Sequence, residues 1–158
     1  MTVTELAGDL LATLGGRSMT MASAESCTGG MVAAAITDIP GASAVFRGGV
    51  VVYSNDAKVR LLGVQAQTIA SFGAVSAQTA QEMASGAART IGADCAVAIT
   101  GIAGPDGGSA DKPVGTVWFG FAVRGATTVE CVHFDGDRRR IREAATAWAL
   151  TRLCVLVR

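Results

Sequence analysis

Charge is scarce in this 158-residue sequence, and neither sign is in excess. Charged residues make up 16% of the chain, against about 25% in ordinary soluble proteins, and 13 lysines and arginines balance 13 aspartates and glutamates. A chain without a broad basic field is not expected to bind nucleic acid. So few charges also favour a homodimer in which part of the apolar surface is covered.

Features typical of secretion, of a membrane span or of a metal site are also missing. The four cysteines, at positions 27, 95, 131 and 154, show no C-x-x-C spacing, and no basic and apolar leader precedes them. The apolar runs are far shorter than the ~18 residues that a membrane span needs. We therefore expect a cytoplasmic protein with reduced thiols, without membrane contact and without a metal site.

The length fits one domain over residues 1–158, and apolar periodicity predicts that helices and strands alternate in it. Helices are expected after four capping residues, Thr2, Ser54, Ser76 and Asp137, and again from Met31. The expected strands are 18–23, 50–53, 95–99, 117–121 and 129–133, the last two forming a hairpin around Gly125. This order indicates a three-layer α/β/α sandwich on a mixed, mainly parallel sheet with a late antiparallel hairpin.

Small polar residues and glycines follow the first expected strand, in the run Ala24-Glu25-Ser26-Cys27-Thr28-Gly29-Gly30. A strand-to-helix turn is the expected shape. The free N–H groups and positive dipole end of a helix start suit an anion or an oxyanion. Ser26 or Thr28 can equally serve as an ordinary N-cap, which is the commoner use of such residues. The pattern by itself leaves both interpretations open.

Two further strand ends carry polar residues, namely Tyr53–Asn55 with nearby Lys58, and the glycine-rich segment 101–113. Ligands of α/β sheets bind beyond the carboxyl ends of the strands, so these segments are expected to converge on Ser26. The only histidine, His133, lies on an expected strand without a carboxylate behind it, which disfavours a serine–histidine pair. Lys58 could replace it as a base if burial lowers its pKa, or it could be a solvated helix residue.

Four sequence blocks, in order and over nearly the whole chain, resemble the CinA-type nicotinamide-nucleotide deamidases. They are A-E-S-C-T-G-G, V-x-Y-S-N-x-A-K, F-G-A-V-S, and I-T-G-I-A-G-P-D-G-G-S with K-P-V-G-T-V-W-F. The family is also known as the C-terminal domain of competence/damage-inducible CinA proteins. The resemblance is to the stand-alone form, without the molybdopterin-binding-like domain of longer relatives. It implies hydrolysis of nicotinamide mononucleotide to nicotinate mononucleotide and ammonia.

The resemblance implies that Ser26 is the nucleophile and that Tyr53 and Lys58 complete the catalytic group. A neutral Lys58, acting directly or through the Tyr53 hydroxyl, would accept the Ser26 proton. Backbone N–H groups of residues 28–30 would hold the oxyanion. No cofactor is implied.

Two arginine-containing regions compete for the substrate phosphate: Arg47-Gly48-Gly49, and the helix start that contains Arg138 and Arg142. Solvated surface arginines are the alternative in the second region. The loop 101–113 is expected to wrap the ribose or the nicotinamide ring. The expected binding residues are Thr28, Gly29, Gly30, Arg47, Gly48, Asn55, Gly101, Gly104, Pro105, Gly107, Gly108, Arg138 and Arg142.

Three other function classes compete with the amidase. The first is a pyridine-nucleotide-binding paralogue without activity, which the presence of Ser26, Tyr53 and Lys58 argues against. The second is an amidase that uses Cys27, for which no histidine partner is apparent. The third is a regulatory module connected with competence, and the sequence offers no partner-binding motif for it.

Overall fold

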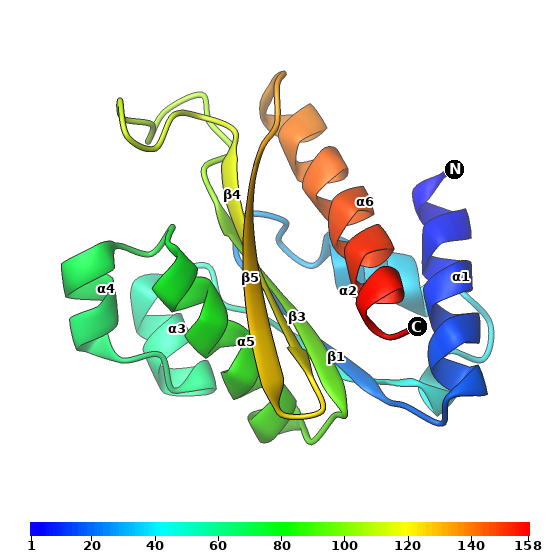
Figure 1. The fold of residues 1–158 in the computed structure, drawn as a ribbon. Coiled ribbons are helices and arrows are strands. Elements are labelled where there is room, and N and C mark those ends of the chain that lie inside the picture. The colour runs from blue at the N-terminus through cyan, green and yellow to red at the C-terminus, as the bar shows by residue number, and fades with distance from the viewer.

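A five-stranded mixed sheet runs through the middle of the protein, and the computed structural model describes all 158 residues (Figure 1). The strands are β1 (Met21–Glu25), β2 (Phe46–Val51), β3 (Cys95–Gly101), β4 (Thr116–Val123) and β5 (Ala126–His133). Their order is β2-β1-β3-β4-β5, with β1 parallel to both β2 and β3 and the last two pairings antiparallel. The predicted mixed sheet with a late hairpin is confirmed.

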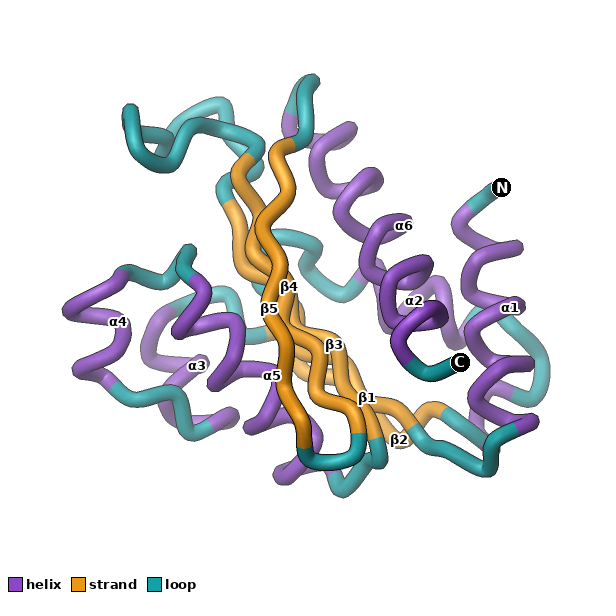
Figure 2. The backbone as a smooth tube through the Cα atoms, in the orientation of Figure 1, coloured by secondary structure: helices purple, strands orange, loops and turns teal.

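Helices cover both faces of this sheet and complete three layers (Figures 1 and 2). The helices are α1 (Val3–Gly16), α2 (Met31–Thr37), α3 (Asn55–Leu62), α4 (Ala66–Phe72), α5 (Ala77–Ile91) and α6 (Arg138–Leu156). On one face α1, α2 and α6 pack together, and on the other α5 packs against the strands while α3 and α4 rest on α5. No helix combines the length and the apolar character that a membrane crossing requires.

The predicted helix starts are largely confirmed, because each capping side chain binds the N–H group three residues further on. Ser54, Ser76 and Asp137 accept hydrogen bonds in this way, and Thr2 forms a complete capping box with Glu5. The helix α4 was not predicted. It is short, exposed, and starts without a side-chain cap, so it leaves little signal in the sequence.

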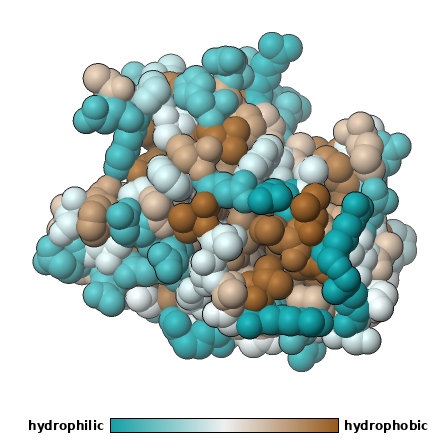
Figure 3. All heavy atoms as spheres, in the orientation of Figure 1, coloured by the Kyte–Doolittle hydropathy of each residue, from teal (hydrophilic) through white to brown (hydrophobic).

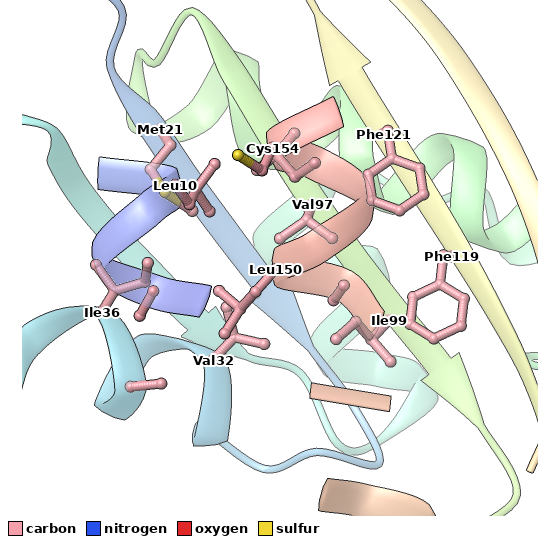
Figure 4. Close-up of a cluster of buried hydrophobic side chains, with 14 of the residues drawn as sticks. Leu10, Met21, Val32, Ile36, Val97, Ile99, Phe119, Phe121, Leu150 and Cys154 are labelled. Atoms are coloured by element: carbon pink, nitrogen blue, oxygen red, sulfur yellow. The ribbon is translucent and has the colours of Figure 1, made fainter. Parts of the chain in front are cut away.

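Two unequal cores lie on the two faces of the sheet. The larger, between the sheet and α1, α2 and α6, is built from large side chains such as Leu10, Ile36 and Phe119 (Figure 4). The smaller, on the α5 side, consists mainly of alanines. Helix α5 and the sheet fill this space by approaching closely rather than with large side chains. A Cβ atom at Gly120 of β4 would collide with the Ala80 carbonyl oxygen of α5. The alanine-rich composition therefore brings α5 close to the sheet.

The segment Arg47-Gly48-Gly49 forms part of β2, which runs from Phe46 to Val51, and this corrects the expected strand of 50–53. The strand begins at Phe46 because its first residues pair with the start of β1, with Gly48 opposite Ala22. A Cβ atom at Gly49 would collide with the Ser23 hydroxyl of β1, so glycine allows this close pairing. Strand β1 likewise begins three residues later and ends two residues later than predicted.

Candidate active site

A cavity of about 270 Å³ opens beyond the carboxyl ends of β1, β2 and β3, where three polar segments were expected to converge. The turn after β1, the start of α3, and the loop between β3 and β4 each contribute to its wall. The predicted residues that line it are Ser26, Tyr53, Asn55, Lys58, Gly101, Gly104, Gly107 and Arg138. The three segments are therefore brought together as expected.

The remaining predicted residues do not line this cavity. Arg47 and Gly48 lie at the beginning of β2, beside the beginning of β1, whereas Ser26 follows the end of that strand. Five strand residues at ~3.3 Å each separate the two ends by roughly 16 Å. Residues 28–30 turn into α2, and Arg142 lies outside the cavity wall, as do Pro105 and Gly108 of the loop.

Lys58 reaches Ser26 from the first turn of α3. Because helical side chains lean toward the helix N-terminus, the lysine points back at the strand ends. Its Nζ lies 3.1 Å from Ser26 Oγ and 3.2 Å from the Tyr53 carbonyl oxygen. The side chain is only 2% exposed and has no carboxylate partner. The interpretation of Lys58 as a solvated helix residue is therefore wrong.

Burial lowers the pKa of Lys58 below its ordinary value, because an ammonium ion loses its hydration in this position. Cys27 opposes this shift in the pKa of Lys58 only when its thiol is ionised. A neutral amine at hydrogen-bond distance from a serine hydroxyl can accept its proton. The pair has the geometry of a nucleophile with its general base.

The Tyr53 hydroxyl accepts a hydrogen bond from Arg138 Nη2 at 2.9 Å and makes none with Lys58. Arg138 also donates through Nη1 to the Gly104 carbonyl oxygen at 2.8 Å. Only the Tyr53 backbone carbonyl contacts the lysine. The contact between Lys58 and Ser26 is thus direct, and Arg138 connects the end of β2 with the glycine-rich loop.

The turn after Ser26 leaves three backbone donors free. The Ser26 N–H donates to Ile99 and the Gly29 N–H to the Ser26 carbonyl oxygen, but the Cys27, Thr28 and Gly30 N–H groups have no acceptor in the protein. Gly30, with φ of 101°, is the N-cap of α2 and supplies no side chain. Neither of the two hydroxyls considered from the sequence therefore caps this helix.

Glu25 takes over this capping role, which the sequence analysis missed. Its carboxylate is buried at the end of β1 and accepts hydrogen bonds from the N–H groups of Val32 (2.8 Å) and Ala33 (3.1 Å). An acidic side chain at a helix N-terminus is stabilised by the helix dipole. The available signal was a single carboxylate between an apolar strand and a helix start.

Arg142 holds the same turn from the other side. Its Nε donates to the Cys27 carbonyl oxygen at 2.9 Å, and its Nη2 to the Thr28 carbonyl oxygen at 3.2 Å. The two arginines that the sequence grouped as phosphate ligands thus have separate tasks. Arg138 faces the cavity, and Arg142 supports the backbone next to the nucleophile.

The alternative catalytic groups are poorly suited to the reaction. Burial raises the pKa of the Cys27 thiol to about 11, so little of the reactive thiolate exists near neutral pH. His133 contacts the Val114 carbonyl oxygen through Nε2 at 3.0 Å and does not line the cavity. All four cysteines are free, and no group of three or more metal-ligating side chains comes together.

Comparison with known proteins gives a consistent set of relatives. The family model described as the CinA C-terminal domain matches residues 3–157. The nicotinamide-nucleotide amidohydrolase PncC of Escherichia coli (strain K12) is 56% identical over 140 residues, covering 87% of this chain and 84% of the relative. A CinA-like protein of Kosmotoga olearia is 52% identical over 132 residues, covering 84% of this chain and 32% of that longer protein.

A solved structure agrees closely with the fold. The crystal structure of the competence/damage inducible protein CihA from Agrobacterium tumefaciens has a TM-score of 0.95 and 45% sequence identity. The similarity covers 99% of this chain and 96% of the other. The arrangement of sheet and helices is therefore shared over the full length of the domain.

Proposed function

The chain belongs to the CinA C-terminal domain family, and from this premise we propose that it hydrolyses nicotinamide mononucleotide to nicotinate mononucleotide and ammonia. The prediction of an amide hydrolase is confirmed at the level of the family, by relatives that carry the name of a nicotinamide-nucleotide amidohydrolase. One observation in this chain carries the proposal. A buried lysine without a counterion lies 3.1 Å from a serine hydroxyl inside the cavity.

In the first half of the proposed reaction, neutral Lys58 accepts the Ser26 proton while Oγ attacks the carboxamide carbon. The tetrahedral intermediate then collapses, and its C–N bond breaks. The lysine ammonium returns the proton to the departing nitrogen, which leaves as ammonia. A nicotinoyl ester on Ser26 remains.

Water completes the cycle in the second half. Lys58 accepts a proton from water, the resulting hydroxide attacks the ester carbon, and the bond to Ser26 Oγ breaks. The lysine then returns the proton to the serine. In both halves the negative oxygen would lie against the free N–H groups of Cys27 and Thr28, a contribution of about 3 kcal/mol for each donor.

Arg138 is the proposed ligand of the substrate phosphate. A guanidinium group has five N–H donors, and hydrogen bonds to Tyr53 and Gly104 leave several of them available. The residue also stands at the first position of α6, where helix N–H groups favour an anion. Arg138→Gln is expected to raise KM about tenfold with little change in kcat. Nicotinamide riboside, which has no phosphate, should be turned over equally by both proteins.

The decisive experiment is incubation of the purified protein with nicotinamide mononucleotide, following ammonia and nicotinate mononucleotide together. Equal amounts of both products are expected, and the Ser26→Ala variant serves as the control. Saturable binding without either product would instead indicate a pyridine-nucleotide-binding protein that does not catalyse the reaction. Absence of both binding and turnover would favour the regulatory class.

The quaternary structure and the compartment form the last part of the proposal. We propose a cytoplasmic homodimer, because charges are few and all four cysteines are free. On the face that Figure 3 shows, apolar residues come to the surface near the centre and are surrounded by polar ones. Such a patch is the kind of surface that subunits cover. Light scattering at micromolar concentration tests this state, and a monomer would contradict it.

A further inference from the structure

We infer that Arg142 is a positioning residue for the oxyanion donors, holding the Cys27–Thr28 backbone in the orientation that hydrolysis requires. The inference rests on the proposed amide hydrolysis and adds to it a residue that does not touch the substrate. It begins from two hydrogen bonds between segments 114 and 115 residues apart in the sequence. One planar guanidinium donates to two successive carbonyl oxygens, which fixes the orientation of both peptide groups.

The geometry of the trans peptide means that binding of the Cys27 carbonyl oxygen by Arg142 also fixes the direction of the Thr28 N–H. In a trans peptide the C=O and the following N–H point in opposite directions. Because Arg142 draws the Cys27 carbonyl oxygen toward itself, the Thr28 N–H must point away from the arginine. That N–H has no acceptor in the protein. The next N–H, of Gly29, already donates to the Ser26 carbonyl oxygen at 3.1 Å and is not available.

The positive charge of Arg142 adds to this effect. A cation bound to the oxygen of a peptide group polarises the group and strengthens its N–H as a donor. The Thr28 N–H is therefore both turned away from the arginine and strengthened as a donor by it. Lysine could supply the charge at this position but could not match the paired in-plane donors.

Glu25 completes the support of the turn. Its buried carboxylate fixes the first turn of α2, while Arg142 fixes the residues between the nucleophile and that helix. The two side chains hold the turn at its two ends. Gly29, with φ of 60°, provides the bend between them. A turn held in this way requires little rearrangement when charge develops on the oxyanion.

A direct role of Arg142 in phosphate binding is the competing interpretation. Arg142 lines a second cavity beside Arg138, but it does not line the cavity that contains Ser26, and at least two of its five donors are committed to backbone carbonyls. The two interpretations predict different kinetics. A phosphate ligand contributes to binding in the ground state and the transition state alike, so its loss raises KM. A residue that orients oxyanion donors acts only on the transition state, so its loss lowers kcat.

The test compares Arg142→Lys and Arg142→Gln with the wild type, using nicotinamide mononucleotide. We expect kcat to fall about ten- to a hundredfold, less than the 10²–10³ that removal of an oxyanion donor costs, and KM to change less than about twofold. Arg142→Lys should keep more activity than Arg142→Gln. The pH at which kcat/KM rises should stay the same, because the contact between Lys58 and Ser26 is untouched.

Arg139→Gln is the matched control, since Arg139 is an exposed neighbour that pairs only with Glu143. It should retain the wild-type kcat. If Arg142→Gln melts below the assay temperature, the kcat and KM of Arg142→Lys still distinguish a positioning residue from a phosphate ligand. A raised KM at unchanged kcat, or no kinetic change, would overturn the inference while leaving the amidase proposal intact. A wild-type protein that releases no ammonia would overturn both.

Discussion

The contact between Lys58 and Ser26 predicts that replacing either side chain abolishes most turnover, and that replacing both costs little more. Ser26→Ala removes the nucleophile, and Lys58→Met removes the amine while keeping most of the side-chain volume. Methionine is preferred to alanine because Lys58 is among the largest fully buried side chains, so truncation to alanine would open a void. Arg60→Gln is the control, because this cation lies on the same helix but is 76% exposed.

The size of the effect follows from the role of the amine. General base catalysis is typically worth 10²–10⁴ in rate, so Lys58→Met should cost about 2.7–5.4 kcal/mol of transition-state stabilisation. Ser26→Ala should cost at least as much. If the two residues act together, the double variant should be little slower than Ser26→Ala alone. Independent residues would instead give a loss close to the sum of the two single losses.

Ammonia release under single-turnover and steady-state conditions measures these rates. The wild-type kcat/KM should also rise with pH to a limb whose pKa lies below the ~10.4 of a free lysine, because burial lowers the pKa of Lys58. The limb should be missing in Lys58→Met. Additive losses in the double variant, or near-normal turnover by Lys58→Met, would refute the serine–lysine pair and reopen direct activation of water.

Three further outcomes are expected. Lys58→Met should raise the melting temperature near neutral pH, because folding lowers the pKa of Lys58 and the wild-type protein must give up a proton that the unfolded chain keeps. This gain should shrink as the pH approaches ~10.4, where the unfolded chain also loses the proton. Gly120→Ala should lower the free energy of unfolding by about 1–3 kcal/mol in denaturant titration, because the new methyl group meets the backbone of α5. Alkylation at pH 7 should modify exposed Cys131 but spare buried Cys27, as peptide mass analysis can show, and turnover should persist.

Much of the fold could be predicted because its signals are local. The caps at Ser54, Ser76 and Asp137, the apolar strands and the glycine turn of the hairpin each occupy a few adjacent residues. The convergence of Ser26 and Lys58 also followed from a general rule about the strand ends of α/β sheets.

What could not be predicted depends on contacts between distant segments. The tasks of Arg138 and Arg142 separate only once α6 is placed against the turn after β1, more than a hundred residues away. From the sequence, both are simply arginines at a helix start. Arg47 attracted attention through its glycine neighbours, but strand pairing places it at the far end of the sheet. No local pattern encodes the end of a sheet at which a residue will lie.

The peripheral position of α3 has a consequence for how the protein loses activity. This short helix carries Lys58, yet it packs on α5 at the outside of the molecule, over the alanine-rich core, rather than within the layer that covers the sheet (Figure 1). Elements with little buried apolar surface open locally at a lower free energy than the whole domain. Excursions of α3 therefore withdraw the base from Ser26 while the sheet remains intact. Turnover should therefore be lost at a lower denaturant concentration than the one that unfolds the domain. The amide protons of α3 should also exchange with solvent faster than those of β1.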